Sequence, residues 1–135
     1  MDELTQADWD DLMDKARAAM ARSHSPYSRF GVGAAILTEK GVYTGANVEN
    51  ASFGLTVCAE RVALFSAVMA EGAENLRVRA IAVANDKQLP CSPCGACRQV
   101  IAEFTNDAQI AFPGEGKIER VSIAELLSHT FRFSA

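Results

Sequence analysis

The spacing of apolar residues changes several times along the chain, and each spacing predicts a different element. From Thr5 to Arg22, apolar side chains recur every three or four positions, as on one face of a helix. These positions are Trp9, Leu12, Met13, Ala16 and Met20. Thr5 has the side chain of an N-cap, and Asp8 stands three residues later, where a capping partner is expected. We therefore predict an amphipathic helix over this segment.

Two short apolar runs follow, and the turn between them predicts a hairpin. The segment Ser25-Pro26-Tyr27-Ser28 interrupts the helical spacing. Gly31 to Thr38 then forms the first run and Val42 to Asn47 the second, with Glu39-Lys40-Gly41 between them. Runs of this length joined by a short turn that contains glycine are typical of paired antiparallel strands.

The segment from Val57 to Glu71 is apolar on nearly every side. Its apolar residues are Ala59, Val62, Ala63, Leu64, Phe65, Ala67, Val68 and Met69. A helix without a polar face is typical of a protein interior. We therefore predict a buried helix that ends at Gly72, because glycine is the residue type favoured just past the end of a helix.

The second half of the chain alternates strands with helices. Ala80 to Ala84 and Ile110 to Phe112 have the length and composition of buried strands. Between them, one side of a predicted helix is lined by Cys97, Val100, Ile101 and Phe104. Ser122 to Ser128 begins with the capping-box pattern Ser122-x-x-Glu125, which predicts a last helix.

This order of elements predicts an α/β fold. Strands that alternate with helices favour crossovers and a largely parallel half-sheet, to which the hairpin adds an antiparallel part. We therefore expect residues 1–135 to form a single domain with three α/β/α layers around a mixed sheet of roughly five strands.

Composition narrows the classes of partner. The net charge is -4, and the thirteen basic residues are dispersed, which argues against a nucleic-acid partner held by clustered Lys and Arg. No apolar stretch approaches the ~20 residues that span a bilayer, and the first residues lack the pattern of a signal peptide. We therefore expect a cytoplasmic protein. Hydrophobic residues make up 49% of the chain, which favours some burial between subunits.

Four cysteines carry the candidate chemistry. Cys94 and Cys97 lie within one turn of a helix that Pro93 would open, and Cys58 lies at the start of the predicted buried helix. Thiols at helix N-termini ionise more easily, and tetrahedral zinc binds thiolates at ~2.3 Å. Three thiolates would leave the fourth position of a catalytic zinc open. Glu60, two residues after Cys58, would then lie beside the metal as a general acid and base.

Two other kinds of site use the same cysteines. Cys91 and Cys94 form a second C-x-x-C pair, so a closed site of four thiolates is conceivable. A thioredoxin-like redox pair is another. Neither alternative needs Cys58-Ala59-Glu60, and a charged Glu60 at the start of an apolar helix is costly unless it has a partner or a function.

Several long motifs resemble the cytidine deaminase family, in its small homotetrameric branch that binds zinc through three cysteines. The motifs are residues 27–35 (YSRFGVGAA), 45–50 (GANVEN), 58–61 (CAER), 93–100 (PCGACRQV) and 125–127 (ELL). The resemblance implies the deaminase fold and hydrolysis of cytidine and 2'-deoxycytidine to uridine and 2'-deoxyuridine, with release of ammonia, in pyrimidine salvage. Zinc deaminases attack C4 of cytosine with an activated water while a glutamate that is not a ligand moves the protons.

The resemblance also implies roles for single residues. Cys58, Cys94 and Cys97 would bind one Zn²⁺ per chain, Glu60 would move protons, and Arg61 would bond the ligand sulfurs and offset the charge of three thiolates. Asn47 and Glu49 would bind the ribose hydroxyls, Phe30 would pack on the pyrimidine, and backbone groups at Ala59 and Cys94 would contact the base edge. Without the resemblance, Phe30 would be assigned to the core, and Asn47 and Glu49 to a turn or strand end.

The sequence departs from the family pattern at two places in the pocket wall. Phe53 stands where many relatives carry Tyr, which removes a hydroxyl. In the family a Phe near the C-terminus closes a neighbouring subunit's pocket; Phe131 aligns best with it, and Phe133 lies close by. A site that borrows Phe53 and Phe131 from neighbours requires a homo-oligomer, a tetramer in this family.

Three other functions use a similar zinc site. An antibiotic-inactivating or modified-cytidine deaminase is the nearest, although residues 47–50 favour a ribonucleoside. Deaminases of nucleic-acid bases generally resemble H-x-E rather than Cys58-x-Glu60. The third is a structural zinc module without catalysis.

Overall fold

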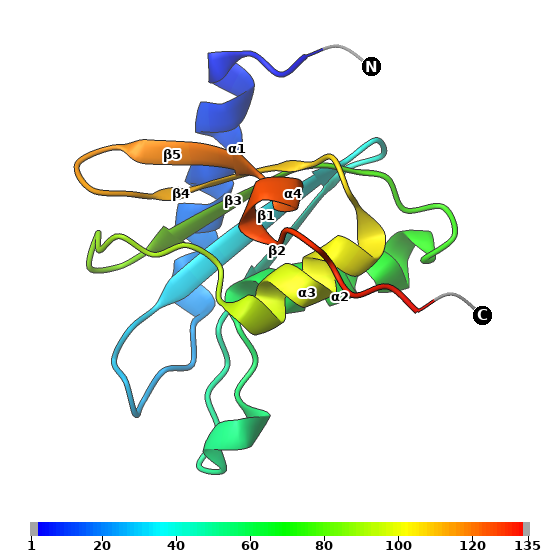
Figure 1. Cartoon of the computed structure of the whole chain (residues 1–135). Coiled ribbons are helices and arrows are strands. Elements are labelled where there is room, and N and C mark those ends of the chain that lie inside the picture. The colour runs from blue at the N-terminus through cyan, green and yellow to red at the C-terminus, as the bar shows by residue number, and fades with distance from the viewer. Residues whose placement is uncertain (1–2, 134–135) are drawn as a thin grey trace.

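A five-stranded sheet of order β2-β1-β3-β4-β5 forms the middle layer of the molecule (Figure 1). The computed structural model describes residues 3–133. The strands are β1 (Val32–Thr38), β2 (Val42–Ala46), β3 (Val78–Asn85), β4 (Gln109–Pro113) and β5 (Ile118–Ser122). The helices are α1 (Gln6–Ala19), α2 (Ala59–Glu71), α3 (Gly95–Phe104) and α4 (Ile123–Leu126), with short 3₁₀ turns η1 (Met20–Arg22) and η2 (Phe53–Leu55).

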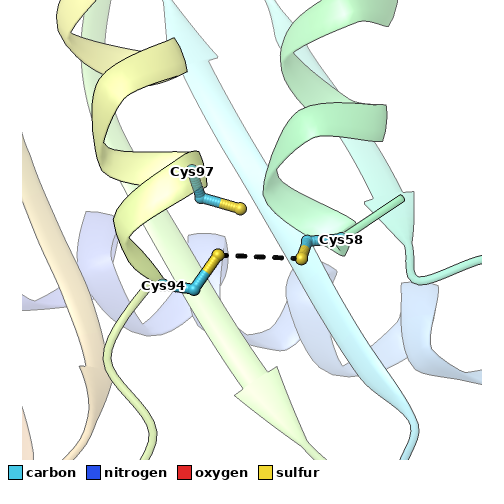
Figure 2. Close-up of side chains that lie close together, drawn as sticks. All are labelled: Cys58, Cys94 and Cys97. Atoms are coloured by element: carbon cyan, nitrogen blue, oxygen red, sulfur yellow. Dashed lines mark hydrogen bonds between the residues drawn. The ribbon is translucent and has the colours of Figure 1, made fainter. Parts of the chain in front are cut away.

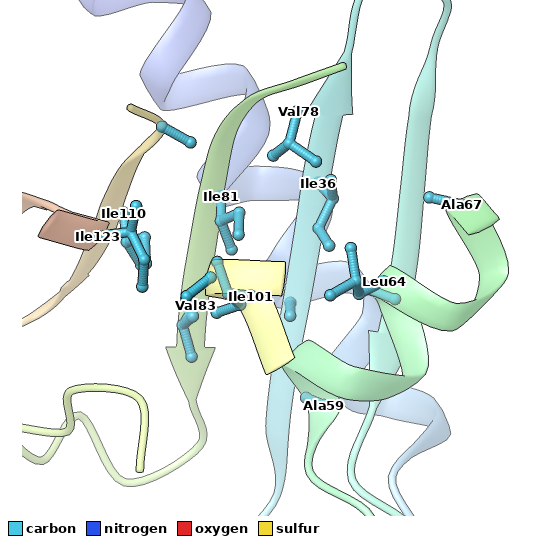
Figure 3. Close-up of a cluster of buried hydrophobic side chains, with 14 of the residues drawn as sticks. Ile36, Ala59, Leu64, Ala67, Val78, Ile81, Val83, Ile101, Ile110 and Ile123 are labelled. Carbon is cyan, nitrogen blue, oxygen red and sulfur yellow. The ribbon is translucent and has the colours of Figure 1, made fainter. Parts of the chain in front are cut away.

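Helices cover both faces of the sheet, which confirms the predicted three layers. Successive residues of a strand point to opposite faces. Ile36 packs in the cluster with α2 and α3, whereas its neighbour Ala35 packs against α1. The face toward α2 and α3 carries larger side chains, such as Ile81 and Ile110 (Figure 3). The face toward α1 carries small residues, and they bring that helix close to the sheet; they are Ala35, Ala80, Ala82, Ala84 and Ala111.

The predicted start of α1 and the predicted end of α2 are confirmed. Thr5 and Asp8 form a reciprocal capping box, with Thr5 Oγ1 accepting from Asp8 N at 3.2 Å and Thr5 N donating to Asp8 Oδ2 at 2.9 Å. Gly72 ends α2 with φ 82°, a conformation that side chains disfavour. Within residues 3–133, no helix is both long enough and apolar enough to cross a membrane.

The prediction of a largely parallel half-sheet is wrong. Among the strands of residues 3–133, only β3 and β4 pair in parallel, whereas β1–β2, β1–β3 and β4–β5 are antiparallel. The crossover through α2 does join strands of like direction, but β1 lies between them. The strand β5 was not predicted, because its sequence Ile118–Ser122 mixes charged and apolar residues. It ends at Ser122, the cap of the predicted terminal helix. That helix is present as α4 and is shorter than predicted, since it ends at Leu126.

The prediction that α2 is buried on all sides is also wrong for a single chain. Ala63, Leu64 and Ala67 are buried against the sheet. On the opposite side, the Met69 side chain is 85% exposed and Phe65 46%. The apolar side chains of α2 therefore lie on two opposite faces of the helix, and only one of these faces packs against the sheet.

Gly45 sets how closely α2 approaches strand β2. A Cβ at this position would lie 2.5 Å from Ala63 N and 2.8 Å from Ala59 O, both backbone atoms of α2. A side chain there would push the first turns of the helix away from the sheet.

We expect Gly45→Ala to lower the free energy of unfolding by about 1–3 kcal/mol, because the added methyl overpacks against backbone that cannot give way locally. Gly54→Ala is the matched control, since a Cβ at Gly54 meets nothing within 4 Å. Urea unfolding of both variants checks this. Equal midpoints for the two variants would contradict the close-packing argument.

Candidate active site

The amino ends of α2 and α3 meet at one point and bring three cysteines together (Figure 2). Cys58 is the N-cap of α2, Cys94 is the N-cap of α3, and Cys97 lies in the first turn of α3. Their Sγ atoms all lie within 4.8 Å of one another, and Cys58 Sγ is 3.9 Å from Cys94 Sγ. The sequence prediction that two helix starts bring these thiols together is confirmed.

The spacing of the three sulfurs fits a tetrahedral metal. Zn–S bonds of ~2.3 Å at tetrahedral angles separate two sulfurs by about 3.8 Å. The separation of Cys58 Sγ and Cys94 Sγ, 3.9 Å, is close to this value. Helix N-termini also stabilise thiolates, because their free N–H groups carry partial positive charge. The donor set therefore could hold zinc.

Cys91 lies outside this group of ligand atoms. Its N–H donates to Pro113 O at 2.9 Å, and its side chain is half-buried. Burial, followed by the nearby charges of Glu60 and Cys58, raises the pKa of the Cys91 thiol. This arrangement favours a three-thiol site over a closed site of four.

Cys58 and Cys97 differ in how easily their thiols ionise. A hydrogen bond with Cys97, together with the Arg61 guanidinium, lowers the pKa of the Cys58 thiol to about 5 in spite of burial. The same hydrogen bond with Cys58, followed by burial, raises the pKa of Cys97. The Cys58 thiol therefore ionises more readily than the Cys97 thiol.

Arg61 supplies positive charge next to the thiolate. Its Nη2 donates to Cys58 Sγ at 3.4 Å, as the family resemblance implies. Its Nε is buried and has no hydrogen-bond partner within residues 3–133. A buried donor without a partner needs an acceptor, and an ionised thiolate is one.

The Glu60 side chain is buried directly beside the thiols. It is 5% exposed, in the first turn of α2. Burial, together with the negative charge at Cys58, raises the pKa of the Glu60 carboxyl to about 7. A carboxyl that gains and loses its proton near neutral pH has the property that a general acid and base needs.

Asn47 anchors the start of strand β1. Asn47 Nδ2 donates to Phe30 O at 2.8 Å, and Asn47 Oδ1 accepts from Val32 N at 2.9 Å and from the Ser23 hydroxyl. The Phe30 side chain is half-buried. The amide of Asn47 thereby fixes where Phe30 lies.

Glu49 anchors the preceding loop. Glu49 Oε1 accepts from Tyr27 N at 2.9 Å and from Ser28 N at 3.1 Å, and Oε2 accepts from the Ser28 hydroxyl. The hydrogen bonds from Ser28, chief among these contacts, lower the pKa of the Glu49 carboxyl. No role was predicted for Ser23 or Ser28, because only the folded chain brings them to these side chains.

Comparison with known proteins gives the family. The family described as the cytidine and deoxycytidylate deaminase zinc-binding region matches residues 7–112. The chain belongs to this deaminase family. A cytidine deaminase of Halalkalibacterium halodurans is 48% identical over 123 residues, 89% of this chain and 91% of that protein. One from Sporosarcina psychrophila is 43% identical over 127 residues, 92% of this chain and 91% of that protein.

Solved structures of cytidine deaminases have the same fold. The crystal structure of cytidine deaminase from Burkholderia pseudomallei matches with a TM-score of 0.82 and 41% identity. The match covers 95% of this chain and 100% of that chain. The crystal structure of cytidine deaminase from Mycobacterium tuberculosis matches with a TM-score of 0.79 and 36% identity. The match covers 93% of this chain and 98% of that chain. The deaminase fold expected from the sequence is thereby confirmed.

The aromatic residues expected at the pocket wall of this deaminase-family chain lie on its surface. Phe53 is at η2, on an arm that projects from the sheet (Figure 1), and its ring contacts Tyr27 edge-on at 5.7 Å between centroids. The Phe131 side chain is 70% exposed and Phe133 83%. Such rings are available to a neighbouring molecule.

We expect Cys91→Ser to retain about one zinc per chain, because three thiolates suffice for a deaminase-type zinc with one open position. Cys94→Ser is the matched comparison and is expected to lose most of the metal. Zinc and protein are measured on the same purified samples. Loss of zinc in Cys91→Ser would instead support a closed site of four thiolates.

Proposed function

We propose that this protein is a zinc-dependent enzyme that hydrolyses cytidine and 2'-deoxycytidine to uridine and 2'-deoxyuridine with release of ammonia. The observation that carries the proposal is the buried Glu60 carboxyl, with a pKa of about 7, beside three converging thiols. Relatives named cytidine deaminase, among them one that is 48% identical, support the substrate class. The reaction belongs to pyrimidine salvage.

The metal would be held by Cys58, Cys94 and Cys97, one Zn²⁺ per chain. Zinc held by three protein ligands supplies a Lewis acid that activates water at neutral pH. Three thiolates would give a Zn²⁺ site a net charge of about -1, which weakens that Lewis acid. The Arg61 guanidinium, 3.4 Å from Cys58 Sγ, withdraws part of this negative charge.

Glu60 would carry the protons of the reaction. As a carboxylate it accepts a proton from the attacking water, and as a carboxylic acid it donates one toward the departing amine. Hydrolysis at C4 of the base therefore consumes one water and releases one ammonia, with Glu60 returned to its starting state. Burial keeps both forms accessible near neutral pH by raising the pKa to about 7.

Substrate contacts would come from Asn47 and Glu49 and from Phe30, in the loop that these two side chains hold. Asn47 Nδ2 has two hydrogens and gives one to Phe30 O, so the other can bond a ribose oxygen. Glu49 is ionised, accepts only, and suits the ribose hydroxyls as donors. Phe30 would pack on the pyrimidine, and backbone groups at Ala59 and Cys94 would contact the base edge.

Ammonia release from cytidine and 2'-deoxycytidine by the zinc-loaded protein tests the function. Glu60→Gln is expected to keep zinc and to lower kcat by at least about 10²–10⁴-fold, because it preserves shape but cannot accept a proton. Exposed Glu125→Gln serves as the matched control and keeps wild-type rates. A zinc-loaded wild type inactive on both nucleosides would refute the function, and loss of zinc in Glu60→Gln would make Glu60 a ligand.

The active unit would be a homo-oligomer, most simply a tetramer with shared sites. The uncovered face of α2 forms a shallow apolar hollow of about 680 Å³; its lining residues are Val57, Val62, Phe65, Ser66, Met69 and Ala70. Phe53 and Phe131 would enter the pocket of a neighbouring subunit. All four cysteines are free thiols, which suits the cytoplasm as the location. The family match over residues 7–112 suits a single deaminase domain over residues 1–135.

Light scattering tests the assembly. A tetramer has a mass of about 58 kDa, four times the chain mass of 14.5 kDa. Met69→Glu is expected to lower the mass toward that of one chain, since it places a charge on the apolar face of α2. Ile118→Glu is the control, because Ile118 is exposed but lies on β5. A wild-type monomer would rule out shared sites.

A further inference from the structure

The Arg98 side chain joins two segments that are far apart in the sequence. Its Nε donates to Pro93 O at 2.8 Å and its Nη2 to Ser92 Oγ at 2.9 Å. Its Nη1 donates to Leu126 O at 2.8 Å. All three nitrogens of one guanidinium are thus used, two on the loop that leads into Cys94 and one on the end of α4.

These bonds act on the peptide that carries a candidate zinc ligand. The Pro93 carbonyl and the Cys94 N–H belong to one planar peptide unit, so a bond to Pro93 O also orients the Cys94 backbone. No carboxylate pairs with Arg98 within residues 3–133. Its charge is therefore directed at carbonyl and hydroxyl dipoles, and hydrogen bonds from charged donors are stronger than neutral ones.

The residue after Arg98 in α3, Gln99, holds a segment near the C-terminus. Gln99 Nε2 donates to Phe131 O at 3.1 Å, and Arg132 Nη1 donates back to Ala102 O at 2.9 Å. The segment after α4 consequently runs beside α3 (Figure 1). One helix, α3, which is capped by Cys94 and contains Cys97, thus sets the place of Phe131.

We propose that Arg98 is a positioning residue that couples the zinc loop to the C-terminal segment, with Gln99 completing the connection to Phe131. The inference rests on the proposed function of the cysteine site. Arg98 acts by two routes: it holds the Ser92–Cys94 loop, which retains the metal, and it holds Leu126, which leads to the segment bearing Phe131. Gln99 acts by the second route alone.

The two routes are separable by mutation. Removing outer partners of metal ligands weakens metal affinity by about 10–100-fold. Arg98→Gln is therefore expected to release zinc to a colorimetric chelator about tenfold faster or more. It also raises the KM for cytidine several-fold. Gln99→Leu raises KM but leaves zinc release unchanged. Arg77→Gln is the control, since Arg77 also donates to two carbonyls, Glu74 O and Leu76 O, without contacting the site.

Several results would overturn the proposal. Wild-type zinc release and KM in Arg98→Gln would do so, as would equal changes in Arg77→Gln, which would indicate general destabilisation. If circular dichroism shows that Arg98→Gln does not fold, zinc release is measured on Arg98→Lys instead. One ammonium cannot reach three acceptors together, so wild-type zinc release there counts against the proposal. If wild type does not deaminate cytidine, the proposed function fails, and zinc release alone decides on Arg98.

Discussion

The meeting of two helix N-termini is the constraint on which the rest of this site depends. Cys58 and Cys94 are both N-caps, so their sulfurs stand where unsatisfied backbone N–H groups favour negative charge. The two sulfurs lie 3.9 Å apart. The helix that carries Cys58, α2, packs closely against strand β2 of the hairpin. Gly45 permits that approach, because any larger residue would meet the backbone of α2.

Burial and charge at this point determine the acid–base chemistry. Glu60 follows Cys58 in the first turn of α2 and is buried there. Burial raises the pKa of its carboxyl to about 7. The neighbouring thiol behaves oppositely, because Cys97 and Arg61 stabilise its thiolate and lower its pKa to about 5. One small region therefore contains a group that readily ionises and a group that readily holds a proton.

Side-chain hydrogen bonds hold the loops that surround the thiols. Asn47 and Glu49 hold the loop before β1 through backbone groups at Phe30 and Ser28. Arg98 holds the loop before Cys94 and the end of α4. These long-range polar contacts fix the loops relative to the cysteines, while residues 3–133 leave the Phe53 and Phe131 rings and the apolar face of α2 exposed.

Local features of this protein followed from the sequence, because they depend on residues a few positions apart. The Thr5 cap, the hairpin, the end of α2 at Gly72 and the cysteines at two helix starts are of this kind. Strand direction, the pairing of β5, the exposed side of α2 and the exclusion of Cys91 were decided by tertiary structure. So were the acceptors of Arg98. Each depends on contacts between distant segments, and no spacing along one chain specifies which segment will lie alongside another.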